Sequence, residues 1–207
     1  MKVIASHYQG DCTWIPEYTD DYFIYDRSFD GCGLDTTKVK KTRNIGNVDY
    51  DRLTYIIENY EILPEVFILT KSNLFQFITE EEFEEVKDNT TLTPLLTQNH
   101  EEKMCHWDKS KRFSYYEDGM YYELNNSWFL GTVPAKYFSC FEEFARTFFF
   151  DSPEYIPFAP GGNYIVTREA IHKHSKQFYQ RMRIFLPYSI LPGEAQIIER
   201  SYYLLWS

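Results

Sequence analysis

The chain has 207 residues, of which 43% are hydrophobic and 25% charged, a composition that excludes global disorder and allows a sizeable core. Its formal net charge of -10 argues against a broad basic surface for nucleic acid or anionic membranes. No apolar run is long enough for a signal peptide or a membrane span. We therefore expect one cytoplasmic domain over residues 1–207.

Two short strands and a long connection are predicted in the first quarter of the chain. Apolar runs at residues 3–6 and 22–25 indicate buried strands. Residues 27–48 are rich in Gly, Asp, Thr and Lys, which predicts an irregular connection whose basic run lies in solvent. We expect Asn47 or Asp49 to cap the helix that follows.

A helix and a third strand come next. Four apolar residues recur at the spacing of one helical face: Leu53, Ile56, Ile57 and Tyr60. The apolar run at 66–69 then indicates another buried strand. Strand, helix and strand in this order are typical of a parallel βαβ sheet. The expected fold class is therefore α/β, a Rossmann-like mixed and mainly parallel sheet flanked by helices.

The remaining elements are less regular in the middle than at the end. Capping-box patterns at 79–82 and 139–142 predict two helix starts. Residues 88–137 have no stable period, which predicts loops and short strands that cover a cleft. The last third predicts one strand and three helices, at 163–166, after Thr167, around 178–185 and over 193–205.

Polar residues follow each predicted strand of the sheet. In parallel α/β sheets, ligands tend to bind at the carboxyl ends of the strands. The candidates for binding a nucleotide are His7, Tyr8 and Asp11 after the first strand, Asp26 after the second, and Lys71 and Asn73 after the third. Ordinary turn chemistry is the alternative explanation for the aspartates.

The most specific pattern is Pro-Gly-Gly-Asn-Tyr at 160–164, followed by Thr-Arg-Glu at 167–169. It resembles the glycine-rich turn, strand and helix of glycosyltransferases with the GT-A fold, where this element lines the acceptor and sugar side of the cleft. The resemblance implies that role for Gly161, Gly162 and Asn163. Glycines permit it physically, because they allow close approach of a ligand and positive φ.

More narrowly, the chain resembles an uncharacterised family of small GT-A-like domains from fungi, bacteria and some viruses. The matching segments lie in order at 3–8 with Trp14, 47–55, 57–67 and 161–206, so they span nearly the full chain. The resemblance implies a nucleotide sugar as donor. It also implies the host cytoplasm as the location if the chain is viral.

GT-A enzymes usually hold Mn²⁺ or Mg²⁺ with an Asp-x-Asp motif at a strand end, because the ion neutralises the leaving diphosphate. Here the third strand ends in Thr-Lys-Ser-Asn at 70–73, so Lys71 is the candidate cation in place of a metal. A solvent-facing lysine is the alternative. Asp49 and Asp51 match Asp-x-Asp as a string, but their place at a helix start favours a cap over a metal site.

The resemblance also implies a carboxylate base near the start of a helix after the glycine-rich element, as in inverting GT-A enzymes. Glu194 fits that position, and Glu199 is the second candidate. The alternatives are a first-turn glutamate that interacts with the helix dipole and a structural partner for Arg200 or Arg168.

The resemblance thus predicts a glycosyltransferase that moves a sugar from a nucleotide donor to a hydroxyl. The acceptor classes left open are a glycan, a small metabolite and a hydroxymethylated base of phage DNA. Because the strand-end Asp-x-Asp is missing, a catalytically inactive binding or scaffold protein of GT-A shape is the alternative.

Overall fold

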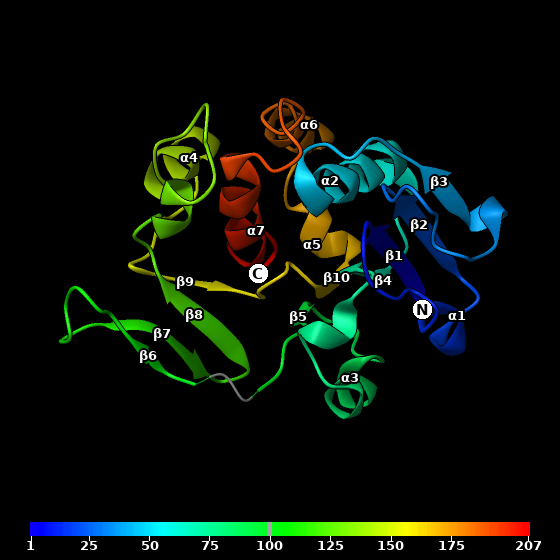
Figure 1. Cartoon of the computed structure of the whole chain (residues 1–207), viewed down its shortest axis with the longest axis horizontal. Coiled ribbons are helices and arrows are strands. Elements are labelled where there is room, and N and C mark those ends of the chain that lie inside the picture. Colours follow the sequence, from blue (N-terminus) through cyan, green and yellow to red (C-terminus); the bar gives the residue numbers. More distant parts are fainter. Residues whose placement is uncertain (99–100) are drawn as a thin grey trace.

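The computed structural model describes residues 1–98 and 101–207, and its centre is a six-stranded sheet (Figure 1). The strands lie in the order β3-β2-β1-β4-β10-β5. Their bounds are β1 (Lys2–His7), β2 (Tyr22–Asp26), β3 (Val39–Lys41), β4 (Val66–Lys71), β5 (Thr93–Pro94) and β10 (Tyr164–Thr167). The first four pair in parallel, whereas β10 and β5 are antiparallel. The expected mixed and mainly parallel α/β sheet is therefore confirmed.

Helices cover both faces of this sheet (Figure 1). On one face lie α2 (Asn47–Asn59), α5 (Arg168–His172), α6 (Lys176–Arg183) and α7 (Gly193–Trp206); on the other lie α1 (Ile15–Tyr18) and α3 (Glu80–Val86). Alternate strand residues point to opposite sides, so Ile4 and Leu69 join the α2 side and Ala5 and Ile68 the α1 side. Short 3₁₀ turns occupy Thr36–Lys38, Tyr60–Ile62, Leu74–Gln76 and Trp128–Gly131.

A second, antiparallel sheet follows in the order β6-β7-β8-β9. Its strands are β6 (Lys103–Met104), β7 (Arg112–Glu117), β8 (Met120–Leu124) and β9 (Tyr155–Phe158), with α4 (Phe141–Phe148) beside them. The expectation of loops and short strands over 88–137 is confirmed for residues 88–98 and 101–137, and residues 99–100 lie outside the described residues; β7 and β8, however, form a regular hairpin. Asp118 and Gly119 make its turn with φ of 50° and 80°. An Asp-Gly pair is the usual sequence of such a turn and was available as a signal.

The start of α2 differs from the prediction. Gly46, in the left-handed region with φ of 68°, precedes the helix, and no side chain caps it. The amides of Gly46 and Asn47 instead donate to the carbonyls of Ser189 and Ile190, at 2.7 and 2.9 Å. The predicted caps Asn47 and Asp49 are therefore wrong, because a distant loop supplies the acceptors and Asp49 is free to face the interior.

The two predicted capping boxes have different outcomes. The capping box at Thr79 and Glu82 is confirmed. The second is displaced by one residue: Cys140 takes the cap position, while the Glu143 carboxylate accepts from the Ser139 amide at 2.7 Å. The irregular connection predicted at 27–48 contains the short edge strand β3. Three residues are too few to show the alternation of apolar and polar residues that indicates a strand. Within the described ranges, no helix has both the length and the apolar character needed to cross a bilayer.

Candidate active site

The carboxyl ends of β1, β2 and β4 meet at one edge of the sheet, beside the turn that enters β10. Ser6 is level with Lys71, and His7 with Asp26. Asn163, fully buried, ties the turn to this edge because its Oδ1 accepts from the Lys71 amide at 2.9 Å. The sequence correctly predicted one edge for His7, Asp26 and Lys71, and Asn163 joins them because β10 is antiparallel to β4.

The sheet divides the predicted residues between its two sides. His7 follows Val3 and Ala5 on the α1 side, where its Nδ1 lies 3.2 Å from Ser72 Oγ. Lys71 precedes Ser72, so its side chain points to the α2 side instead. Because side chains alternate along a strand, His7 and Lys71 lie on opposite sides of the sheet, although both follow strands at the same edge.

On the α2 side, four charged side chains meet around the backbone of Gly161. Lys71 Nζ lies 3.7 Å from Glu199 Oε2, and Glu199 Oε1 accepts from the Gly161 amide at 3.3 Å. Arg52 pairs with Asp49 at 3.1 Å and donates to the Gly161 carbonyl at 2.8 Å. We call Asp49, Arg52, Lys71 and Glu199 the charge cluster. Charged side chains therefore form hydrogen bonds with both the backbone amide and the backbone carbonyl of Gly161.

Burial controls the electrostatics of the charge cluster. Desolvation raises the pKa of Asp49, which Arg52 opposes and the nearby Glu199 reinforces. Burial and the neighbouring Asp49 also raise the pKa of Tyr202 well above its ordinary value. The Lys71 side chain, at 21% exposure, is the most accessible member. A ligand would therefore meet the cluster through Lys71.

The glycine pair is explained by the side chains of the chain itself. Gly161 and Gly162 have φ of 84° and 67°. A Cβ on Gly162 would lie 2.4 Å from Arg52 Nη1, and one on Gly161 would lie 2.7 Å from the Phe77 ring. The close approach that the glycines permit is therefore made by Arg52 and Phe77, and contact with a sugar stays a prediction.

Glu194 lies in a different environment from Glu199. Its buried carboxylate accepts from the amides of Lys136 and Tyr137 at 2.7 and 2.6 Å and from the Tyr188 hydroxyl. Glu199 lies five positions further along the same helix, about 7.5 Å along its axis. Of the two predicted bases, Glu199 is the one that contacts Gly161.

Asp51 and Asp49 have separate partners. Asp51 accepts from Ser6 Oγ at 2.9 Å and pairs with Arg27 Nε at 2.5 Å. Burial raises its pKa, and Arg27 opposes this. Asp49 pairs with Arg52, so the Asp-x-Asp string does not present two carboxylates to one ion. Within residues 1–98 and 101–207, no group of three His, Cys, Asp or Glu side chains is placed to hold a metal.

A cleft of about 380 Å³ opens on the α1 side of the same edge. Trp14 Nε1 donates to the Ser72 carbonyl at 2.7 Å and joins the two loops that form it. Of the predicted nucleotide ligands, Asp11 and Asn73 line this cleft. The Asp11 carboxylate accepts from the Thr13 amide and hydroxyl, which lower its pKa. The lining residues are Gly10, Asp11, Thr13, Trp14, Glu17, Ser72, Asn73, Phe75, Gln76 and Glu80.

The last two candidates do not line the cleft. Tyr8 is exposed, directly after β1. Asp26 is buried and bonds to Ser28 and to Lys41, whose Nζ lies 2.9 Å away. Burial alone raises the Asp26 pKa, but the bonds from Ser28 and Lys41 outweigh it and lower the pKa. Asp26 therefore has internal partners that account for its ionised state.

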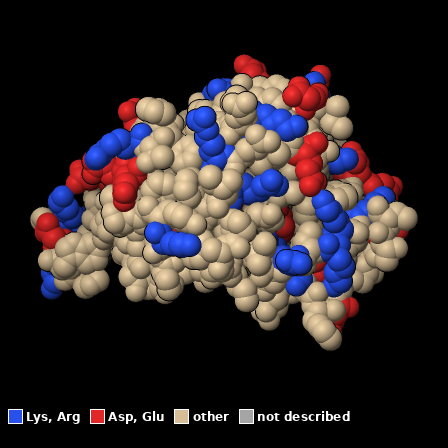
Figure 2. Space-filling view, turned by 90° about the horizontal axis from the view of Figure 1, so that it is seen from above, with Lys and Arg blue, Asp and Glu red and all other residues tan. Residues whose placement is uncertain are grey.

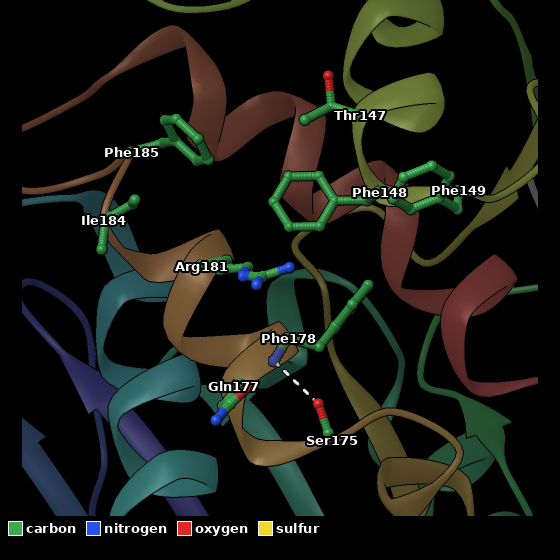
Figure 3. Close-up of a pocket in the computed structure, with 9 residues that line it drawn as sticks. All are labelled: Thr147, Phe148, Phe149, Ser175, Gln177, Phe178, Arg181, Ile184 and Phe185. Carbon is green, nitrogen blue, oxygen red and sulfur yellow. Dashed lines mark hydrogen bonds between the residues drawn. The ribbon is translucent and has the colours of Figure 1, made fainter.

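An apolar pocket of about 400 Å³ lies between α4 and α6, and its lining includes Phe148 and Phe178, which pack edge to face with 5.3 Å between ring centroids (Figure 3). Among the described residues that line it, Arg181 is the one ionisable residue, and its guanidinium points into the space (Figure 3). No carboxylate lines it. The pocket therefore lacks the acid–base groups that the charge cluster provides.

Sequence reasoning did not select Arg52 or Tyr202. Each lies three residues after an acidic member of the charge cluster, Asp49 and Glu199 respectively, on the same helix. Residues at i and i+3 share a helical face, so this spacing was the available signal. No such signal in the sequence indicates the contact between Phe77 and Gly161, because these two residues are far apart in the chain.

The comparisons with known proteins place the chain in a family. Neither the curated proteins nor the solved structures gave a match. One family model, described as "Protein of unknown function (DUF3431)", matches residues 2–207. The match covers the sheet edge, the glycine pair and the last helix. The chain therefore belongs to the DUF3431 family.

Proposed function

We propose that the protein is a nucleotide-sugar-dependent glycosyltransferase with its reaction centre at Lys71 and Glu199. The observation that carries the proposal is the 3.7 Å approach of these two side chains beside Gly161, at the carboxyl end of β4. A cation and a carboxylate at this edge supply the two charges that the reaction needs. The GT-A-like sequence pattern around the glycine pair supports the same reaction class.

In the proposed reaction, the acceptor hydroxyl attacks the anomeric carbon of the sugar. The new carbon–oxygen bond forms as the bond to the diphosphate breaks, and the hydroxyl proton passes to Glu199. The Lys71 ammonium balances the negative charge on the leaving diphosphate. Donor binding would also draw Lys71 away from Glu199 and free that carboxylate to accept the proton.

The cleft on the α1 side supports a place for the nucleotide. The cleft includes Ser72, the residue next to Lys71. A donor that lies over the sheet edge would therefore reach the cleft on the α1 side and Lys71 on the α2 side. Asp11 and Asn73 offer an acceptor and an amide for ribose or base, and Trp14 and Phe75 offer aromatic surface.

A binding or scaffold protein without catalysis is the second candidate. The observation in its favour is that each member of the charge cluster already has a partner within the chain. Buried charges paired with one another in this way also occur where they have only a structural role. The two candidates differ in whether Glu199 must move a proton.

The first experiment replaces Glu199 by Gln and measures donor hydrolysis and transfer with a panel of nucleotide sugars. Gln keeps an oxygen for the Gly161 amide but removes the base, so turnover should fall about 100-fold or more while donor affinity is kept. Lys71→Ala should instead weaken donor binding, measured as a smaller thermal shift with and without Mn²⁺.

Glu194→Gln is the matched control, because it changes a second buried carboxylate on the same helix. It should lower stability through weaker bonds to the amides of Lys136 and Tyr137, yet keep turnover per folded molecule. Full activity in Glu199→Gln removes Glu199 from the mechanism. No thermal response of the wild type to any donor favours the scaffold candidate.

A further inference from the structure

A separate cavity of about 280 Å³ lies between β3, α2 and the end of α6. Figure 2 looks onto this face, and Lys and Arg side chains gather there over β3 and beside α2. The lining residues are Tyr25, Lys40, Thr42, Arg43, Ile45, Tyr50, Asp51, Thr54, Glu58 and Arg183. This basic concavity contrasts with the net charge of -10 for the whole chain.

Three cations line the cavity, and their number exceeds that of the carboxylates. Asp51 is already neutralised by Arg27 behind it, at 2.5 Å. Glu58 pairs with Lys40 at 3.1 Å, but both side chains are close to half exposed, so solvent weakens that pair. An anion can therefore compete for Lys40 at little cost.

The two arginines are differently held. Arg183 Nη1 donates to Thr54 Oγ1 at 3.0 Å, and its guanidinium lies 5.5 Å from the centre of the Tyr50 ring, which fixes its orientation. The Arg43 side chain has no hydrogen bond or ion pair within the described ranges, and the residue is exposed. One oriented and one unpaired guanidinium therefore border the same space.

Two buried polar atoms, one in the cavity lining and one behind it, have no hydrogen-bond partner among the described residues. Thr42 Oγ1 belongs to the lining, whereas Arg27 Nη2 belongs to the residue that neutralises Asp51 and does not itself line the cavity. Buried donors normally find an acceptor, so unpaired ones indicate an acceptor that the chain itself does not supply. Each atom carries a hydrogen that it can donate, which is what an anion requires of its partners.

We propose that this cavity binds the phosphoryl group of a ligand, a phosphate or diphosphate, between Lys40, Arg43 and Arg183. The guanidiniums match the oxygens of a phosphoryl group in shape and charge, and the Thr42 hydroxyl adds a neutral donor. The site is distinct from Lys71, and the proposal does not depend on glycosyl transfer. A free inorganic diphosphate and the diphosphate of a nucleotide are the two sources of this chemistry.

The test is calorimetric titration of the full chain with inorganic pyrophosphate at low and high salt. Arg43→Ala and Lys40→Ala should each weaken binding roughly tenfold, and high salt should weaken binding to the wild type. Neither side chain is buried, so both variants should fold. Arg146→Ala is the control, because it removes an exposed arginine of α4 that pairs with Glu142 outside the cavity.

A parallel titration with UDP separates the two sources. Tighter binding of UDP than of pyrophosphate, lost in Arg43→Ala, identifies a nucleotide diphosphate; equal affinities identify the phosphoryl group alone. Unchanged pyrophosphate affinity in the Lys40→Ala, Arg43→Ala double variant overturns the proposal. If Lys71→Ala abolishes binding instead, the phosphoryl site lies at the charge cluster, and the proposed reaction centre survives while this inference fails.

Discussion

At the residue scale, Arg52 accounts for much of the geometry around the glycine pair. Its guanidinium is buried, pairs with Asp49 and binds the Gly161 carbonyl. Removing one partner of a buried ion pair typically costs about 3–5 kcal/mol, because it leaves an uncompensated charge. Gly162 is therefore best understood as the residue that leaves room for Arg52.

This view predicts the effect of Gly162→Ala. The methyl group would meet Arg52 Nη1 at 2.4 Å in addition to the strain of a φ of 67°. The free energy of unfolding should fall by about 3 kcal/mol or more, since strain alone accounts for roughly 1–2 kcal/mol. Urea unfolding followed by tryptophan fluorescence measures the change.

Gly33→Ala is the matched control for this substitution. Gly33 has a similar φ of 71°, but no atom lies within 4 Å of the added Cβ. Only the strain should appear, roughly 1–2 kcal/mol. An equal loss in the two variants would show that Arg52 yields to the methyl group and that the glycine pair has another purpose.

At the element scale, His174 connects the segment between α5 and α6 to the end of α7. Its Nε2 lies 3.0 Å from the Leu205 carbonyl oxygen, and its ring stacks on Phe178 with 4.2 Å between centroids. Burial lowers the His174 pKa, and the hydrogen bond to Leu205 opposes this only in part. The folded chain thus favours the neutral imidazole at this junction.

A pH dependence follows with a definite sign. Because the folded pKa is lowered, the unfolded chain binds the proton more strongly, so the stabilisation is present above the unfolded pKa of about 6.5 and is lost below it. Wild-type stability should therefore fall between pH 7 and pH 5 by more than that of His174→Gln. Urea midpoints at the two pH values give the comparison, and parallel curves would contradict the role assigned to His174.

At the scale of the whole molecule, α7 joins the two sheets. It packs against β9 on one side and α2 on the other. Arg200 donates to Glu123 of β8 from Nε and Nη2, at 2.9 and 2.8 Å, and both side chains are buried. The Arg200 guanidinium also lies 4.1 Å from the centre of the Phe129 ring. The pair therefore fixes the second sheet against the helix that carries Glu199.

Arg200→Ala tests this connection. It leaves Glu123 buried without its cation, so the free energy of unfolding should fall by about 3–5 kcal/mol. Arg112→Ala is the control on the second sheet, because Arg112 and Glu102 form an exposed pair worth less than about 1 kcal/mol. Equal losses in the two variants would show that the Arg200 pair contributes no more than a surface contact.

The sequence by itself determined the α/β class, the main strands of the parallel sheet and the last helix, because these depend on local apolar periodicity. It also brought His7, Asp26 and Lys71 to one edge, since parallel strands end together, whereas Asn163 reaches that edge because β10 is antiparallel to β4. Membership in the DUF3431 family confirms that an uncharacterised family covers nearly the full chain, and the GT-A-like character expected of that family stays a prediction.

Only the tertiary structure decided which of these residues meet. Strand alternation separated His7 from Lys71, and the Ser189 and Ile190 carbonyls replaced the expected helix cap with contacts from a distant loop. Glu199 rather than Glu194 reached Gly161, since the helical phase and the position of the neighbouring segment determine where each carboxylate lies. These outcomes depend on contacts between residues far apart in the chain, and the local spacing of apolar residues does not predict such contacts.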